Sequence, residues 1–267
     1  NILGTIVSGN RGIDFFNGVN AGGLSNTSLI VGETGSIFGN AHGIILAGGD
    51  NNAVRNSGTI SSKNDEAVVL EGGTNNIVEN HGLISSSNDR AVAIFGLATP
   101  GTLINTGTLT GIGGTASTAT VFMQGESVVN SGTIIATQDV AISVEFQTSI
   151  INSGLIIGDI SSNTGSSIAV ANSDEIAGSV TLSNVADDYR ASGNGSAGEI
   201  NLRGGNDVAL GASANDSING GSGADSILGG SGDDFIEGGT SLDTIRGGSG
   251  NDEIFGDGGG DSIRSQS

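Results

Sequence analysis

The sequence contains no cysteine, no tryptophan and a single proline, and aromatic residues make up only 3% of its 267 residues. Without cysteine, no disulfide can hold the fold together. With so few large rings, a core has to come from many stacked Val, Ile, Leu and Ala side chains, and short regular strands suit that supply best. These absences argue against an ordinary globular domain and in favour of a regular β-structure.

Basic residues are scarce as well, because 8 Lys and Arg face 28 Asp and Glu and the formal net charge is −20. Nucleic-acid affinity rests mainly on Lys and Arg that neutralise phosphates, and anionic lipid surfaces would repel this chain too. An acidic balance can mean disorder, a solvated surface or a need for multivalent cations, and the many β-branched residues argue against disorder. We therefore expect no nucleic-acid partner and favour a cation.

Long apolar runs are also missing. No run approaches the roughly 18 to 20 residues that a membrane-spanning helix needs, and no basic and apolar leader follows Asn1. We therefore expect no membrane span. Because a strand-like run, Ile2 to Val7, begins directly after Asn1, we also expect the chain to be a piece of a longer polypeptide.

Glycine, by contrast, is abundant, with 49 copies, and many of them mark a repeat. The repeated phrase is Asn, a small residue, Gly, then Ser, Thr or Leu, then an aliphatic residue. Its glycines are Gly58, Gly82, Gly107, Gly132 and Gly154, with weaker copies at Gly35 and Gly178. Successive glycines are 22 to 25 residues apart, a step that predicts one solenoid coil per repeat.

A second apolar phrase follows each glycine, as in Ile44 to Leu46 and Val68 to Leu70, and residues that favour turns separate the phrases. Stacked coils would place aliphatic residues in internal columns at about 4.8 Å spacing, and the asparagines in an amide ladder. We predict an all-β fold in which residues 1–183 form a parallel β-helix of about 24 residues per coil. The stretch from Phe16 to Ser28 is the least repetitive and is interpreted as an insertion.

A second repeat, with a strict period of nine residues, runs from Leu202 to Arg264. Its sixth position is always Asp, and its eighth is Ile in every copy except the first, which has Ala209. Several copies depart from the glycines at positions one, two and four, and we expect weaker sites there. These departures include Leu202, Arg203, Ala212, Ala214 and the pair Ser241 and Leu242.

These copies closely resemble the RTX (repeats-in-toxin) family, whose consensus is G-G-x-G-x-D-x-U-x, with U aliphatic. The resemblance implies a calcium-binding parallel β-roll of 18 residues per coil over residues 202–267, with residues 184–201 as a transition. It also implies a secreted, extracellular protein of the bacterial cell surface, exported unfolded and folded by the calcium outside.

The residues themselves also point to calcium. Glycines let the backbone curl so that carbonyl oxygens point inward, and each Asp adds a hard anionic oxygen. Alternate repeats stack, and at an effective dielectric of about 20, unit charges about 5 Å apart repel by roughly 3 kcal/mol. The columns should not stay closed without several Ca²⁺ ions, which accept more flexible oxygen cages than Mg²⁺ does.

Two columns of aspartates are expected from this stacking, one with Asp207, Asp225, Asp243 and Asp261 and the other with Asp216, Asp234 and Asp252. The glycines predicted to complete the metal sites are Gly220, Gly221, Gly223, Gly229, Gly230, Gly232, Gly238, Gly239, Gly247, Gly248 and Gly250.

Other polar residues are interpreted as structural. His42 and His81 are expected to be turn residues, and Tyr189 and Met123 to be coil fillers. The adjacent carboxylates Asp65 and Glu66 are expected in a solvated turn, because neighbouring side chains on a strand point to opposite faces. The pair Asp187 and Asp188 is interpreted in the same way, with an extra cation site as a minor hypothesis. Acid–histidine pairs are expected to be missing, so no catalytic residue is assigned.

The function that this sequence favours is a non-enzymatic, calcium-dependent structural protein of a surface layer, matrix filament or adhesin. A polysaccharide-modifying enzyme, or a non-catalytic module of one, is the main alternative, because lyases and mannuronan epimerases share the β-helix and the epimerases also carry RTX modules. A fragment of a secreted toxin or protease is a third possibility. Solenoid ends expose strand edges, so we expect end-to-end self-association or contact with other surface proteins or polysaccharide.

Overall fold

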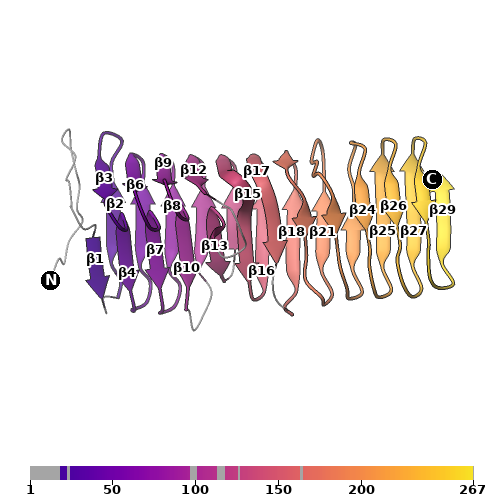
Figure 1. Cartoon of the computed structure of the whole chain (residues 1–267), viewed down its shortest axis with the longest axis horizontal. Coiled ribbons are helices and arrows are strands. Elements are labelled where there is room, and N and C mark those ends of the chain that lie inside the picture. Colours follow the sequence, from indigo (N-terminus) through magenta and orange to yellow (C-terminus); the bar gives the residue numbers. More distant parts are fainter. Residues whose placement is uncertain are drawn as a thin grey trace. The chain divides into compact units, whose positions relative to one another are not determined.

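The computed structural model describes residues 19–22, 25–96, 101–112, 118–125, 127–162 and 165–266. Two compact units divide the chain, an N-terminal unit (Asn1–Val144) and a C-terminal unit (Glu145–Ser267). Within the described residues the fold is all-β, without an α-helix, and nearly all its strands are parallel neighbours in ladders (Figure 1). A helix with the length and apolarity to cross a bilayer is thus also missing from the described part of the chain.

The N-terminal unit is a parallel β-solenoid with three strand ladders. The first ladder contains β2 (Ser28–Val31), β5 (Ala53–Asn56), β8 (Ile77–Asn80), β11 (Thr102–Asn105) and β14 (Ser127–Asn130). The second contains β3 (Ser36–Gly39), β6 (Thr59–Ser62), β9 (Leu83–Ser86), β12 (Thr108–Gly111) and β15 (Thr133–Glu145). The third contains β1 (Val19–Gly22), β4 (Ile44–Ala47), β7 (Val68–Glu71), β10 (Val92–Phe95) and β13 (Val121–Gln124).

The predicted coil length is confirmed in this unit. Hydrogen-bonded residues of neighbouring coils are 24 or 25 positions apart in sequence. The repeat glycines stack on one another, and at Gly82, Gly107 and Gly132 an added Cβ would strike the backbone of the glycine one coil earlier. Glycine is therefore required here by close approach of the coils. Of the predicted insertion, β1 continues the third ladder by pairing with β4, and most of the remainder lies outside the described residues.

Aliphatic columns fill the interior of the N-terminal unit, because alternate residues of each strand point inward. In the first ladder the buried column contains Val54, Val78, Leu103 and Val128. In the second it contains Ile60, Ile84, Leu109 and Ile134. Met123 is fully buried in the third ladder, so its prediction as a coil filler is confirmed.

The predicted amide ladder is also present. Asn56 donates from Nδ2 to Oδ1 of Asn80, Asn80 donates to Asn105, and Asn105 donates to Asn130, each at 2.8 Å. All four side chains are buried, and each of the three donors also bonds a backbone carbonyl in the adjoining turn. A buried amide is stable only when its hydrogen bonds are made, so the ladder sets the register of the coils.

The C-terminal unit is a parallel β-solenoid with two ladders. The first contains β16 (Thr148–Asn152), β18 (Ile168–Asn172), β21 (Asp188–Ala191), β23 (Val208–Leu210), β25 (Ser226–Ser231), β27 (Thr244–Ser249) and β29 (Ser262–Gln266). The second contains β17 (Leu155–Ser162), then β19 (Ile176–Ala177) with β20 (Val180–Thr181), and then β22 (Ile200–Asn201), β24 (Ser217–Asn219), β26 (Phe235–Glu237) and β28 (Glu253–Phe255).

Coil length falls along this unit, from 20 residues between Asn152 and Asn172 to 18 residues in the nonapeptide region. The prediction that Gly178 begins the coil after Gly154 is therefore wrong. The coil here is 20 residues long, so Asn172 pairs with Asn152 and Gly178 lies against Gly158, not Gly154.

Tyr189 explains why the first nonapeptide has Ala209 where the others have Ile. Register places Tyr189 between Val170 and Ala209 in the core column, and its side chain is fully buried. A large ring next to the small Ala209 keeps the volume of the column close to that of stacked Ile residues. The prediction that Tyr189 is a coil filler is confirmed.

Candidate metal centre

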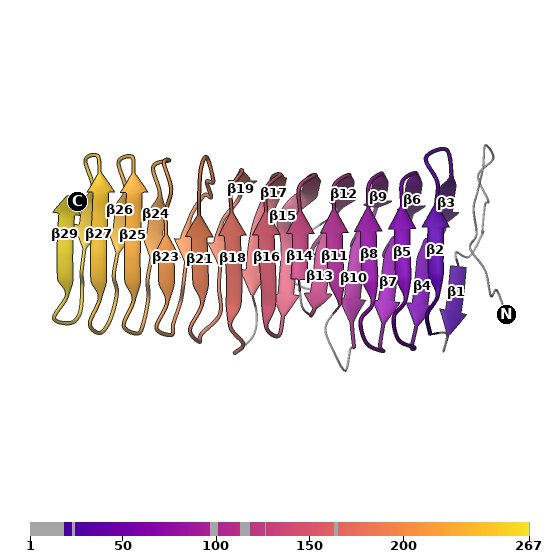
Figure 2. The same ribbon diagram turned by 180° about the vertical axis from the view of Figure 1, so that it is seen from behind.

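Nonapeptides of the same parity stack, as the 18-residue coil requires. Along the first ladder, Ile227 pairs with Ile245 and Ile245 with Ile263, and β23, β25, β27 and β29 follow one another in Figure 2. The loops before these strands carry Asp207, Asp225, Asp243 and Asp261, and the loops before β24, β26 and β28 carry Asp216, Asp234 and Asp252. Both predicted columns are therefore present.

In five of these aspartates one carboxylate oxygen links neighbouring coils, because Oδ1 accepts the backbone N–H of the Asp one coil earlier. The distances are 2.9 Å for Asp207 to Asp225 and for Asp225 to Asp243, 3.0 Å for Asp243 to Asp261, 2.9 Å for Asp216 to Asp234 and 3.2 Å for Asp234 to Asp252. These bonds orient the carboxylates along each column. Asp216 differs, since its Oδ2 accepts the Ala212 N–H of its own loop at 3.2 Å.

The other oxygen is left buried without a hydrogen-bond partner among the described residues. The atoms concerned are Oδ2 of Asp207, Asp225, Asp234, Asp243 and Asp252 and Oδ1 of Asp216. Native proteins rarely leave buried polar atoms unpaired, and an unpaired buried carboxylate oxygen is especially unfavourable. A hard divalent cation is the partner that this chemistry fits.

Glycines at position one keep the space beside these oxygens open. A Cβ at Gly220 would lie 2.7 Å from Oδ2 of Asp225, and one at Gly238 would lie 2.8 Å from Oδ2 of Asp243. At Gly229 and Gly247 a Cβ would crowd the carboxylates of Asp234 and Asp252 in the same way. At these four positions a side chain would therefore crowd the carboxylate oxygen that is left without a partner.

Glycines at positions two and four adopt backbone angles that other residues avoid. Gly221, Gly230, Gly239 and Gly248 at position two have φ from 94° to 117°, and Gly223, Gly232 and Gly250 at position four have φ from 118° to 139°. With these angles each loop stacks on the loop one coil earlier. Backbone hydrogen bonds join positions two to four of one loop to the same positions of the other.

Side chains alone do not complete a metal site here. Within the described residues, His, Cys, Asp and Glu side chains form no group of three or more that could hold an ion. A cation in either column would therefore rely on one or two carboxylates together with loop carbonyl oxygens, a donor set that suits calcium better than magnesium.

Burial makes the charged form of these carboxylates unfavourable when no cation is present. Burial, with a smaller contribution from the charge of the next carboxylate in each column, raises the pKa of Asp207 to about 7 and that of Asp216 to about 6. Burial and the charge of the following aspartate also raise the pKa values of Asp225, Asp234 and Asp243. Desolvation is the larger cause throughout and adds to the repulsion expected from the sequence.

The irregular loops differ from the regular ones in backbone. Arg203, Ser241 and Asp257 are held at φ of 65°, 98° and 60° at position two or four, where the consensus has glycine, and these angles are strained for a residue with a side chain. Ala212 and Ala214 keep negative φ, and the Ala212 N–H donates to Asp216 Oδ2 at 3.2 Å. That these loops bind calcium more weakly stays a prediction.

A family model of the RTX calcium-binding nonapeptide repeat matches residues 203–236 and 228–263. Residues 203–263 are RTX calcium-binding repeats. No curated protein and no solved structure gave a significant match to the chain. RTX repeats imply calcium binding and are typical of secreted proteins, and the buried carboxylate oxygens fit that ion. The aspartates and the loop carbonyls around the glycines of the RTX repeats would hold it, while the domain boundaries at residues 183 and 201 stay a prediction.

One further aspartate extends the first column, and the sequence analysis did not place it there. Asp187 is buried, and its N–H donates to Asp207 Oδ1 at 2.7 Å. Both its own oxygens accept hydrogen bonds from protein donors, so it lacks the open oxygen of the RTX aspartates. Its neighbour Asp188 pairs with Arg190 on the surface. The minor hypothesis of a cation held by this pair gains no support.

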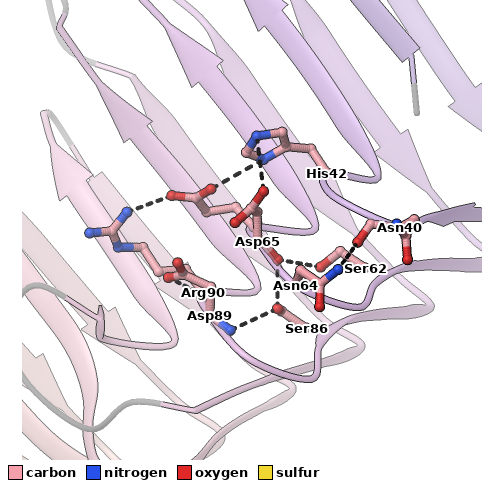
Figure 3. A network of polar contacts seen from close by, with 9 residues as sticks. Asn40, His42, Ser62, Asn64, Asp65, Ser86, Asp89 and Arg90 are labelled. Carbon is pink, nitrogen blue, oxygen red and sulfur yellow. Dashed lines mark hydrogen bonds and ion pairs between the residues drawn. The ribbon is translucent and has the colours of Figure 1, made fainter. Parts of the chain in front are cut away.

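A separate polar network lies on the N-terminal unit, and it contradicts one expectation. His42 lies 3.2 Å from Glu66 and 3.7 Å from Asp65, measured from Nδ1 and Nε2 respectively, so acid–histidine pairs are present (Figure 3). Arg90 bonds Glu66 at 2.6 Å and lies over the ring of Phe122. The expectation failed because a turn, unlike a strand, can direct both adjacent carboxylates toward the same histidine.

Proposed function

We propose that this chain is a secreted, non-enzymatic structural protein whose RTX repeats fold when they bind calcium outside the cell. The unpaired, buried carboxylate oxygens carry the proposal, because they make the closed columns unfavourable until a divalent cation enters. Folding and calcium binding are then one event. The surrounding solenoid coils, built from stacked small and aliphatic residues, suit a stalk of a surface layer, matrix filament or adhesin.

Calcium titration followed by circular dichroism tests this proposal. The purified chain should gain strand signal as calcium rises to millimolar concentration, and chelator should reverse the gain. Replacement of Asp225, Asp234 and Asp243 together by Ala should weaken calcium binding by more than about a hundredfold, since each loss removes a charged ligand from a shared site. The strand signal of residues 30–180 should remain.

A matched control comes from exposed acids outside the RTX loops. Changing Glu33, Glu199 and Glu253 together to Ala removes the same charge without changing an aspartate of either column or a side chain of the loops that carry them. This variant should titrate like the unaltered chain. Equal order of the C-terminal unit in chelator and in calcium would contradict the calcium function.

A polysaccharide-modifying enzyme is the second candidate, and the network around His42 favours it. A histidine between two carboxylates can transfer protons, and Arg90 is a basic side chain near it that suits an acidic sugar. Alginate and pectate are suitable probes, with unsaturated-uronate absorbance and new reducing ends as readouts. Activity that disappears in His42→Ala and persists in His81→Ala would establish this function, since the side chain of His81 bonds Thr106 on an exposed surface, away from any carboxylate pair among the described residues. An inactive chain supports the structural role.

Self-association is the partner interaction that we favour. β29 pairs with β27 on one side, and no described strand covers its other edge. Either following residues of the same polypeptide or another chain can pair with such an edge. End-to-end contact between copies, or contact with other surface proteins or polysaccharide, would cover it.

A further inference from the structure

The column of Asp207, Asp225, Asp243 and Asp261 is extended by one further aspartate, Asp187, which lies one coil before the residues that match the RTX family. Gly205 lies directly against the backbone of Val185 and Ala186, and the Val208 N–H donates to the Asp187 carbonyl oxygen at 3.0 Å. The loop 182–187 is therefore stacked on the loop 202–207. Its nonapeptide, residues 182–190, has Asp187 at position six and the buried Tyr189 at position eight, without any glycine.

The carboxylate of Asp187 is fully engaged by the protein. Oδ1 accepts the Ile168 N–H at 2.6 Å, and Oδ2 accepts both the N–H and the hydroxyl of Ser183 at 2.7 Å. Hydrogen bonds to an ionised carboxylate are about twice as strong as neutral ones. At Asp207, by contrast, Oδ1 accepts the Asp187 N–H and Oδ2 has no partner among the described residues.

We propose that Asp187 is the first member of this column, that it is held in place without metal, and that it positions Asp207 to bind calcium. It thereby determines where calcium-driven ordering begins. This inference rests on the proposed calcium function and specifies how it is regulated. Ser183 and Ile168 supply the donors that a cation supplies further along. Because the loop 182–187 is already ordered without calcium, calcium binding does not have to supply the free energy that orders it. The apparent affinity for calcium is therefore higher than it would be if the loop were disordered.

The opposite column has no such first member. The loop one coil before Asp216 carries Gly198 where the repeat would have Asp, and Gly198 bonds Gly178 through backbone atoms. Ordering should therefore start between Asp207 and Asp225 and proceed toward Asp261, and the second column should follow.

Three variants test the role of Asp187. Asp187→Ala removes this carboxylate, and Ser183→Ala removes only the hydroxyl donor while the Ser183 N–H stays. Asp188→Ala is the matched control, because it removes one charge at the next position, where the side chain is 40% exposed and pairs with Arg190. All three are compared in calcium titrations and in amide hydrogen exchange of the full chain.

Without calcium, the amides of Ile168, Ser183 and Asp187 should be protected in the unaltered chain, while those of Ser226 and Ser262 exchange. As calcium rises, Ser226, which bonds the Asp207 carbonyl, should become protected before Ser262, which bonds the Asp243 carbonyl. Asp187→Ala should raise the calcium midpoint by about tenfold, and Ser183→Ala by about threefold. Asp188→Ala should change neither the midpoint nor the order.

Two results would overturn the inference while leaving the calcium function intact: a midpoint for Asp187→Ala equal to that of Asp188→Ala, or protection of Ser262 before Ser226 in the unaltered chain. If Asp187→Ala does not fold at saturating calcium, an unchanged midpoint in Ser183→Ala would overturn it. A chain that shows no calcium response at all would contradict the calcium function itself.

Discussion

The aspartates of the RTX columns use their two oxygens for different purposes. In Asp225, Asp234, Asp243 and Asp252 one oxygen accepts a backbone N–H from the coil before, and the other is buried beside a position-one glycine without a donor among the described residues. The first contact is structural and is present without metal. The unpaired oxygen makes the stacked columns unstable unless a cation binds it or a proton neutralises it. Calcium and acid should therefore both stabilise the columns.

Proton binding should therefore stabilise the metal-free columns. The pKa of Asp207 is raised from 3.8 to about 7 and that of Asp216 to about 6, so the folded state binds protons more tightly than the unfolded state. This contribution is fully present below about pH 4 and is lost as pH rises through 6 to 7. In decalcified protein, the urea midpoint of the C-terminal unit should fall between pH 5 and pH 7.5.

With calcium bound, the same groups should give the opposite trend, because protons compete with the ion and affinity rises with pH. Asp207→Asn, which cannot gain a charge, should flatten the upper part of the metal-free profile. Metal-free stability that increases from pH 5 to pH 7.5 would contradict this account.

Elements of the fold differ in how far the sequence predicts them. The nonapeptide ladder was predictable because each rung contains its glycines, its aspartate and its core Ile in nine consecutive residues. The coils of about 24 residues were predictable where Gly58, Gly82, Gly107 and Gly132 stack. Gly178 was misplaced because coil length changes along the chain, and a phrase search has no means of detecting that change.

The sequence did not reveal contacts between residues that are far apart in the chain and meet only because neighbouring coils are aligned. Glu66 and Arg90 are 24 residues apart, and the same step separates His42 from Glu66. Charged residues one coil length apart were thus the signal that could have found this network. Asp187 lacked the glycines that identify a repeat, and only its spacing of 20 residues from Asp207 indicated its place in the column.

At the scale of the whole molecule, each unit is stabilised mainly between neighbouring coils, so a terminal coil lacks contacts on one side. In the C-terminal unit the last described coil includes β29, where Ile263 is 45% exposed although Ile245, one coil earlier in the same column, is fully buried. Further residues of the same polypeptide or a second copy of the chain would cover Ile263, and either requires that calcium has first ordered the coil.

Self-association should therefore depend on calcium and on Ile263. Light scattering should detect oligomers at millimolar calcium and monomers after chelation. Ile263→Asp, which places a charge at the end of the column, should shift the protein to monomers in calcium, since charged edges resist pairing. Leu242→Asp is the matched control, because Leu242 is 65% exposed on a lateral loop, and it should assemble like the unaltered chain. Monomers in both conditions, or equal assembly of the two variants, would exclude this edge as the contact.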